Sequence, residues 1–149
     1  MLWSKSNIQL NYVIRRLDEI KRSIVTQAAI YAQPAIKAEI EQAFAGEISP
    51  AEKKWAPLKP QKSGGKLKNY SKDRKILRGL VDYFTTILSG VGKISVRNSK
   101  WYTKFHQSGT KHMEDRRFLP APGEVVHGWE DRVSAPIKSK VNRMLGGSL

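Results

Sequence analysis

The sequence contains no cysteine, only three histidines and few acidic residues. Without cysteine the chain can form no disulfide, offers no thiol nucleophile and cannot build a zinc site from thiolates. The three histidines, His106, His112 and His127, are too few and too irregularly spaced to indicate a metal site. We therefore expect neither a metal ion nor another cofactor.

Long hydrophobic runs are also missing. No stretch approaches the roughly 20 apolar residues that are needed to cross a bilayer, and the first residues lack the apolar core of a signal peptide. These absences predict a soluble protein, intracellular when made, with no membrane partner. The 149 residues, 40% of them hydrophobic, fit one domain with a real core, since domains usually span roughly 100 to 200 residues.

Basic residues dominate what is present. The chain has 27 lysines and arginines against 13 acidic residues, a formal charge of +14 that predicts an anionic or acidic partner. Residues 53–75 hold nine of these basic residues and only one acidic residue, a net charge of +8. This stretch also contains two prolines and two glycines, so we interpret residues 47–75 as a long basic loop rather than as a helix or strand.

Apolar residues before this loop recur at intervals of three to four residues. The pattern predicts an amphipathic helix in residues 1–46, with one buried face and an end near Gly46. Pro34 should kink or restart that helix. The positions on the predicted face are Leu10, Val13, Ile14, Leu17, Ile20, Ile24, Ala28 and Tyr31, followed by Ile36, Ile40 and Phe44.

The second half of the chain changes period. Residues 84–88 are typical of a strand, residues 89–92 of a turn, and residues 93–97 alternate as a second strand. In that second strand Ile94 and Val96 should be buried, whereas the alternate positions Lys93, Ser95 and Arg97 should be exposed. Phe118 and Leu119 suggest a third strand. A helix is also predicted at each end of this region, over residues 72–80 with Ser71 as its N-cap and over residues 133–145 before Gly146.

We interpret the segment from Trp101 to Pro122 as the centre around which the chain is organised, since it links a short aromatic helix to an extended strand. Trp101 and Phe105 are four residues apart, so one helical turn places them on the same face. Gly109 follows where a left-handed residue would end this helix. The predicted fold class is α+β: a long N-terminal helix packed on a small antiparallel or mixed sheet, with a short central helix and a C-terminal helix in residues 76–149.

Three short motifs in fixed order resemble the phage virion-morphogenesis family of tail-completion proteins. They are Trp55-Ala56-Pro57-Leu58, then Tyr102 followed by His106-Gln107-Ser108-Gly109, and then Arg117-Phe118-Leu119. The chain departs from the family pattern at Thr103, where a small residue is usual, and at Ser108, where an aromatic residue is common. It also lacks the proline that the family usually has before this arginine, Arg117. The Leu-x-x-Thr-Gly-x-Leu element that the family carries in its middle is matched only loosely, by Leu77-Arg78-Gly79-Leu80.

The resemblance implies a structural virion protein and not an enzyme. It implies a tail-completion or tail-terminator subunit that forms a ring, with six subunits expected, at the head-proximal end of a phage tail. The tail tube, a sheath terminator and neck or connector proteins would be its partners, after assembly in the host cytoplasm. Tyr102, His106, Gln107, Gly109, Phe118 and Leu119, with Trp55, Pro57 and Leu58, are expected to maintain the shared fold.

Partner contacts are expected from the basic loop. The candidate residues are Lys53, Lys54, Trp55, Lys59, Lys62, Lys66, Lys68 and Arg117. Trp55 is alternatively a loop anchor packed on the domain. Arg117 is expected to pair with an acidic residue of a neighbouring subunit.

Two other functional classes were compared with this interpretation. The candidate catalytic residues are His106, Ser108, Glu114 and Asp115, but they form no recognised nucleophile motif and lack the carboxylates of a metal-dependent nuclease. A nucleic-acid-binding module is the stronger alternative, because basic residues alternate with Trp55 and Tyr70 as phosphate contact and base stacking require. The two interpretations overlap, since a head–tail subunit would lie beside genomic DNA.

Overall fold

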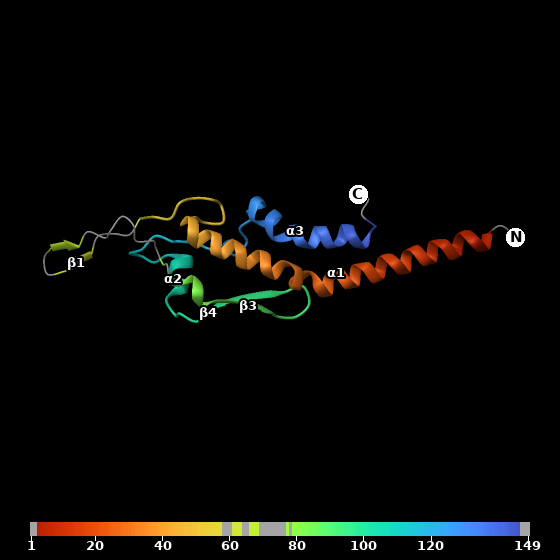
Figure 1. Ribbon diagram of the computed structural model, residues 1–149, viewed down its shortest axis with the longest axis horizontal. Coiled ribbons are helices and arrows are strands. Elements are labelled where there is room, and N and C mark those ends of the chain that lie inside the picture. The colour runs from red at the N-terminus through yellow and green to blue at the C-terminus, as the bar shows by residue number, and fades with distance from the viewer. Residues whose placement is uncertain (1–2, 58–60, 64–65, 69–76, 78, 147–149) are drawn as a thin grey trace.

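The computed structural model describes residues 3–57, 61–63, 66–68, 77 and 79–146. The fold is α+β, as predicted: a long N-terminal helix packs against a two-stranded antiparallel sheet, and shorter helices complete the domain (Figure 1). The elements of the main body are α1 (Trp3–Gly46), η1 (Val81–Tyr83), β3 (Phe84–Leu88), β4 (Ile94–Asn98), α2 (Thr103–Ser108) and α3 (His127–Met144).

Helix α1 runs through Pro34 without a break, so the predicted restart does not occur. Proline lacks the N–H that would bond to the carbonyl of Ile30, and its ring crowds the same carbonyl. Figure 1 shows α1 changing direction about midway along its length, which agrees with the predicted kink. The end at Gly46 is as predicted.

The described part of the apolar face of α1 is buried only from Ile20 onward. Ile20 is the first buried position among the described side chains, and Ala32, Ile36, Ile40 and Phe44 belong to the core. By contrast, Val13, Ile14 and Leu17 are 48%, 47% and 53% exposed, respectively. The expectation of one continuously buried face is therefore wrong at these three positions. Helix α3 lies beside α1 only part of the way, and α1 extends alone toward the N-terminus (Figure 1).

The hairpin β3–β4 confirms the predicted change of period. Strand β3 has the predicted bounds, whereas β4 begins one residue later than expected, and Phe84 pairs with Asn98 across the two strands. Ile94 and Val96 pack against the core as predicted. Ser95 is half-buried rather than exposed, because its hydroxyl lies 2.8 Å from that of Ser89 at the turn.

The expected third strand at Phe118 and Leu119 is absent, and their segment is irregular. The side chain of Gln107 takes the place of a neighbouring strand. Its Oε1 accepts the backbone N–H groups of Phe118 and Leu119 at 3.2 and 3.3 Å, and its Nε2 donates to the carbonyl of Leu119 at 2.6 Å. One amide therefore satisfies three backbone groups that a sheet would otherwise have to satisfy.

Aromatic rings form the centre of the core. Phe44 of α1 meets Trp55 edge to face at a centroid distance of 5.3 Å, and Phe118 meets Phe84 at 4.7 Å. Phe44 and Phe118 lie 5.5 Å apart, which joins the two pairs. Segments far apart in the sequence are thus held by one cluster of rings, an arrangement worth more than its buried area alone.

The predicted basic loop contains regular structure after all. Strands β1 (Gln61–Ser63) and β2 (Lys66–Lys68) pair antiparallel, so the expectation of a loop without elements is wrong there. Figure 1 shows this hairpin at the opposite end of the molecule from the N-terminus. Most of the helix predicted over residues 72–80, including its Ser71 cap, lies outside the described residues. The described residues at its end, 77, 79 and 80, form a turn in which the N–H of Leu80 donates to the carbonyl of Leu77, so the prediction of a helix is wrong there.

Helix α3 begins six residues earlier than predicted, at His127 instead of Val133. The periodic apolar residues predicted only its second part, where Val133 and Ile137 pack against the core. The earlier turns carry polar residues around Trp129, so no apolar period marked them. Gly146, with φ of +90°, follows the end of the helix, as its position in the sequence indicated.

Candidate interaction surfaces

Trp55 anchors the first part of the predicted basic loop on the rest of the domain. Its side chain is 7% exposed, and its indole N–H donates to the backbone carbonyl of Arg117 at 2.9 Å. Its own backbone N–H donates to the carbonyl of Glu47, which closes the turn after α1. The structure therefore favours the anchor interpretation of Trp55 over direct partner contact, because a buried ring offers no surface.

Arg116, which no motif or pattern in the sequence marked, holds the other side of this junction. It is 5% exposed, and its guanidinium donates to the carbonyls of Ala56 and Pro57 at 3.1 and 3.3 Å. Successive residues of an extended segment point to opposite sides, so of two adjacent arginines only one faces inward. No sequence signal indicates which, since that depends on the segment against which they pack.

Arg117 faces the other way and is bound within its own chain. Its guanidinium donates to the carboxylates of Asp115 and Glu124, the latter at 3.2 Å. The hydrogen bond and charge of Asp115, followed by those of Glu124, raise the pKa of Arg117 above its usual range. Pairing across a subunit boundary, as the sequence analysis proposed, would have to exchange one of these partners.

Residues around α2 serve the fold. Tyr102 and His106 meet edge to face at 6.1 Å between ring centroids, and Gln107 fixes the segment at Leu119. Gly109 has φ of +71°, as expected for a residue after a helix, although its ψ of 179° is extended and not left-handed helical. A Cβ there would lie 3.2 Å from the backbone of Met113 and Asp115.

Two of the candidate catalytic residues, Ser108 and His106, have different environments. The hydroxyl of Ser108 donates to the carbonyl of Lys104 at 2.7 Å, which is a contact within its own helix. Burial and the nearby charge of Arg116 lower the pKa of His106, and its Nδ1 is buried without a hydrogen-bond partner. Within the described ranges no three His, Cys, Asp or Glu side chains gather as metal ligands.

The candidate lysines have different environments. Lys54 and Lys53 are both exposed, and Lys54 donates to the carbonyl of Gly46 at 2.7 Å and so satisfies the C-terminal end of α1. Both line a small cavity of about 160 Å³ whose other charged groups include Glu114, Asp115 and Glu124. Lys62 lies in β1 and Lys66 and Lys68 lie in β2, while Lys59 and Leu58 fall outside the described residues.

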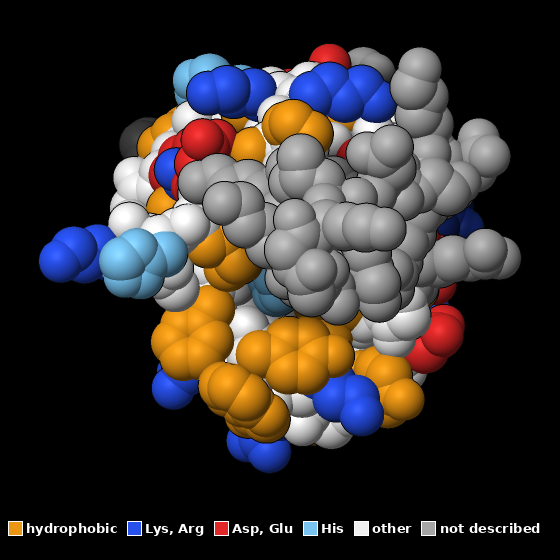
Figure 2. Space-filling view, turned by 90° about the vertical axis from the view of Figure 1, so that its left-hand side faces the viewer, with side chains coloured by type: hydrophobic (Ala, Val, Ile, Leu, Met, Phe, Trp, Pro, Cys, Tyr) orange, Lys and Arg blue, Asp and Glu red, His pale blue; other side chains and the backbone are white. Residues whose placement is uncertain are grey.

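An aromatic patch lies on the surface around α2, formed by Tyr83, Trp101, Tyr102 and Phe105. Trp101 is 75% exposed and contacts Tyr102 and Phe105 edge to face, each at 5.8 Å between ring centroids. The contact with Phe105 confirms that the two share a face. Figure 2 shows hydrophobic side chains with lysines or arginines at their border on the lower part of this end of the molecule.

A groove runs between the second half of α1 and the segment that begins β3. Its volume is about 660 Å³. Apolar side chains form much of its lining, and charged groups, two of them acidic, accompany them. The lining residues are Lys37, Glu41, Phe44, Ala45, Val81, Asp82 and Phe84.

Comparison of this chain with protein-family models, with curated proteins and with solved structures gave no match. The resemblance to tail-completion proteins therefore rests on the order of the three motifs in the sequence. Within the part of the chain that the structure describes, no helix is both long enough and apolar enough to span a bilayer.

Proposed function

We propose that this protein is a structural subunit of a phage tail, a tail-completion or tail-terminator protein that assembles into a ring and joins the tail to the neck. The observation that carries this proposal is the exposed apolar face of the first half of α1. A helix with an apolar face is stabilised by packing that face on another element, and no described element of the same chain covers Val13, Ile14 and Leu17. When such subunits assemble into a ring, a neighbouring subunit can pack against this exposed face.

The positions of the three motifs in the fold give further support to the proposed tail-completion function. Trp55, Gln107 and Phe118 come from motifs far apart in the sequence, yet they meet at one junction through the bonds of Trp55 to Arg117 and of Gln107 to Phe118. Motif residues that hold one another in place are the positions that a shared fold would need. They explain why the motifs occur together without requiring a catalytic role.

The proposed partners are further copies of this chain, with six to a ring, together with the tail tube, a sheath terminator and neck proteins. The basic segment supplies the long-range attraction to acidic partner surfaces, because more than half of the net charge lies within residues 53–75. Charge reversal at Lys53, Lys66 and Lys68 should weaken binding to purified tail tubes at physiological salt. Unchanged binding would remove this role from the basic segment.

The matched control for that experiment is Lys54. Its ammonium group is bonded to Gly46, so Lys54→Glu should lower stability as well as charge. Lys53→Glu changes the same net charge at an exposed neighbour. If tail-tube binding falls equally in both variants while Lys53→Glu stays folded, the lost positive charge, and not a loss of stability, explains the weaker binding.

Non-specific nucleic-acid binding remains the second candidate, favoured by the aromatic patch. Lys100 lies 4.0 Å from the ring centroid of Tyr83 and Lys104 lies 5.1 Å from that of Phe105, beside the exposed Trp101. Stacking rings bordered by lysines suit a single strand. Light scattering at low and high salt, with and without a short DNA, separates the candidates: a salt-independent ring supports tail completion, whereas tight DNA binding that falls steeply with salt supports the alternative.

A further inference from the structure

We propose that the exposed first half of α1 docks into the groove beside Phe44 of a second copy of this chain, in a head-to-tail contact. The inference rests on the proposed function and specifies its subunit interface. It names one donor, the stripe formed by Val13, Ile14 and Leu17, and one acceptor, the groove between the second half of α1 and β3. The stripe fills the groove with apolar side chains, and charges on both sides align it.

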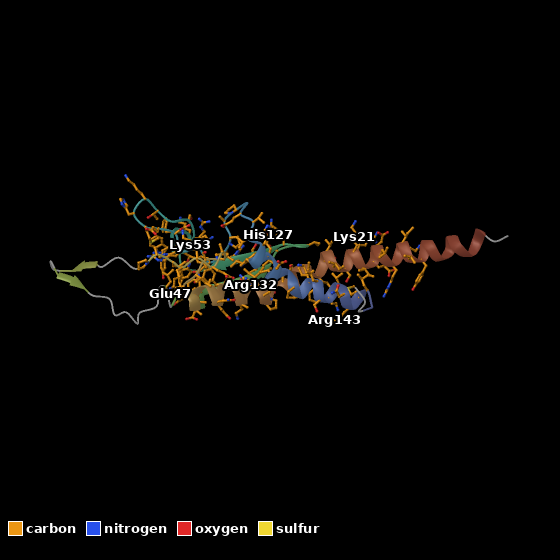
Figure 3. All side chains as sticks on the ribbon, turned by 90° about the horizontal axis from the view of Figure 1, so that it is seen from above. Lys21, Glu47, Lys53, His127, Arg132 and Arg143 are labelled. Atoms are coloured by element: carbon orange, nitrogen blue, oxygen red, sulfur yellow. The ribbon has the colours of Figure 1, made fainter. Side chains whose placement is uncertain are left out.

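The exposed stripe continues the apolar face of α1 that packs against the core. Val13, Leu17 and Ile20 follow one another at spacings of four and three residues, so the exposed stripe and the buried face of α1 are the same face. Figure 3 shows where α3 stops covering α1. Arg143, near the end of α3, lies at about the level of Lys21, and α1 continues alone beyond it. The stripe thus begins where α3 ends.

The acceptor has the matching chemistry. Phe44, Val81 and Phe84 give it an apolar lining. Glu41 and Asp82 are exposed among its charged groups, although Glu41 also lies 3.9 Å from Lys37. An apolar groove with acidic groups suits an apolar helix face that has basic groups at its border.

Charged side chains border the stripe: Arg16 and Lys21 are basic, and Asp18, four residues after Ile14, is acidic. Arg16 follows Val13 by three residues and Lys21 follows Leu17 by four, which places each next to the stripe on the helix surface. Arg16 lies 3.4 Å from Glu19, but both side chains are more than 60% exposed, so this pair holds it weakly. Both cations are therefore available to face the acidic groups of the groove.

One chain cannot make this contact with itself. Leu17 and Phe44 lie on the same helix, separated by about 40 Å along its axis at the usual rise per residue. The stripe must enter the groove of another molecule, whose own stripe is then available to a third. Such heterologous contacts generate a ring when the rotation closes, and they generate a filament when it does not.

Pairing of two stripes with each other is the competing arrangement. Among the side chains of α1 that the structure describes, from Tyr12 onward, the exposed stripe covers less than one heptad before α3 begins to cover the same face. Coiled coils need about three to four heptads of sustained pattern, so a self-paired stripe would be weak. It would also yield a two-fold dimer, which leaves the groove empty and cannot extend to a ring.

Single cysteines test the contact cleanly, because the chain has none of its own. Leu17→Cys and Ala45→Cys are prepared as separate proteins, mixed, and oxidised; Leu17 is 53% exposed and Ala45 lines the groove. We expect a disulfide-linked dimer in the mixture and almost none in either protein alone. Cross-linking of Leu17→Cys with itself, or an absence of cross-linking in the mixture at any concentration and on tail tubes, would overturn the inference.

Two further variants complete the experiment. Val125→Cys, at a 63% exposed position outside the groove, replaces Ala45→Cys as the negative control. A chain carrying both Leu17→Cys and Ala45→Cys should give a ladder of linked oligomers that ends at the size of the ring. A ladder without a defined end would indicate a filament and would contradict the ring of the proposed function, while still supporting the contact.

The mass of the assembly separates failure of this contact from failure of the proposed function. Leu17→Asp should lower the fraction of assembled protein at least tenfold, whereas Arg15→Ala, an equal change of charge at an exposed position on the opposite face of the helix, should leave it unchanged. An intact ring in Leu17→Asp would overturn the contact and leave the tail function standing. Wild-type protein that neither assembles alone nor binds tail tubes would overturn the proposed function together with the contact.

Discussion

At the scale of single residues, the chain uses buried polar groups where regular structure is missing. Arg116 binds two carbonyls of the segment after Trp55, and Gln107 binds three backbone groups of the segment after Arg117. Each irregular segment is thus held by one long side chain. Removal of such a side chain leaves several backbone groups unpaired at once, which costs more than an average hydrogen bond.

Gln107→Glu should destabilise the protein by about 2 kcal/mol, because the carboxylate keeps the acceptor but loses the N–H that serves Leu119. Urea denaturation measures the loss. Ser108→Ala, at the exposed neighbour in the same helix, should change stability by less than about 0.5 kcal/mol. Equal losses in the two variants would show that the amide of Gln107 has no special role.

Gly109→Ala should be costly for two separate reasons. Its φ of +71° is unfavourable for alanine, and the new Cβ would approach the backbone of Met113 and Asp115 to 3.2 Å. Gly90 separates the two effects, since its φ of +79° is similar but nothing lies within 4 Å of a Cβ there. Thermal melting should show a loss of about 1 kcal/mol in Gly90→Ala and a clearly larger loss in Gly109→Ala.

His106 should make stability depend on pH. Burial, and then the charge of Arg116, lower its pKa in the folded state below the ordinary value of 6.5. The unfolded chain therefore binds a proton more readily, so the contribution is fully present above pH 6.5 and is lost as pH falls through the folded pKa. His106→Gln should flatten the stability profile below pH 6.5, as measured by urea denaturation at a series of pH values.

At the scale of elements, α3 is tied to α1 by apolar packing and by one well-placed ion pair. Arg132 of α3 donates to the carboxylate of Glu39 on α1 at 2.7 Å and lies 3.3 Å from Glu52 in the following turn. The Glu39 side chain is only 10% exposed. The pair therefore joins three segments, and Figure 3 shows Arg132 near the middle of the body.

Arg132→Ala should loosen α3 and lower the free energy of unfolding by about 2 kcal/mol, because Glu39 would be left largely buried without its partner. Hydrogen exchange along α3 should rise in the same variant. Lys138→Ala removes a cation from the same helix whose partner Asp131 is 72% exposed, so it should cost little. Comparable exchange in both variants would contradict a special role for Arg132.

At the scale of the whole molecule, the proposed contacts divide by their response to salt. The screening length falls from about 10 Å at 0.1 M salt to about 3 Å at 1 M, so attraction between the basic segment and an acidic tail surface should fade. Docking of the α1 stripe buries apolar surface, which salt does not weaken. Light scattering at 1 M salt should therefore still show assembled subunits, while tail-tube binding is reduced at least tenfold.

The opposite result would change which surface is assigned to subunit contact and which to tail-tube binding. Subunits that separate at 1 M salt would depend on charge for their contact and not on the stripe. Tail-tube binding that persists at 1 M salt would instead indicate an apolar contact, for which the exposed Trp101 is the first residue to test by Trp101→Ser.

The sequence by itself determined the elements that have a period of their own. The spacing of apolar residues predicted α1 to Gly46, alternation predicted β3 and most of β4, and the position of Gly109 predicted its positive φ. These features depend on neighbours within a few residues, so local chemistry is enough to specify them.

Only the tertiary structure decided which surfaces are covered. The exposure of Val13 and Leu17, the inward direction of Arg116 and the replacement of a third strand by Gln107 all depend on segments distant in the sequence. A periodic apolar face shows that a helix is to be packed, but it does not show whether the same chain supplies the cover. For Val13, Ile14 and Leu17 the described chain supplies none, because α3 ends before it reaches the stripe.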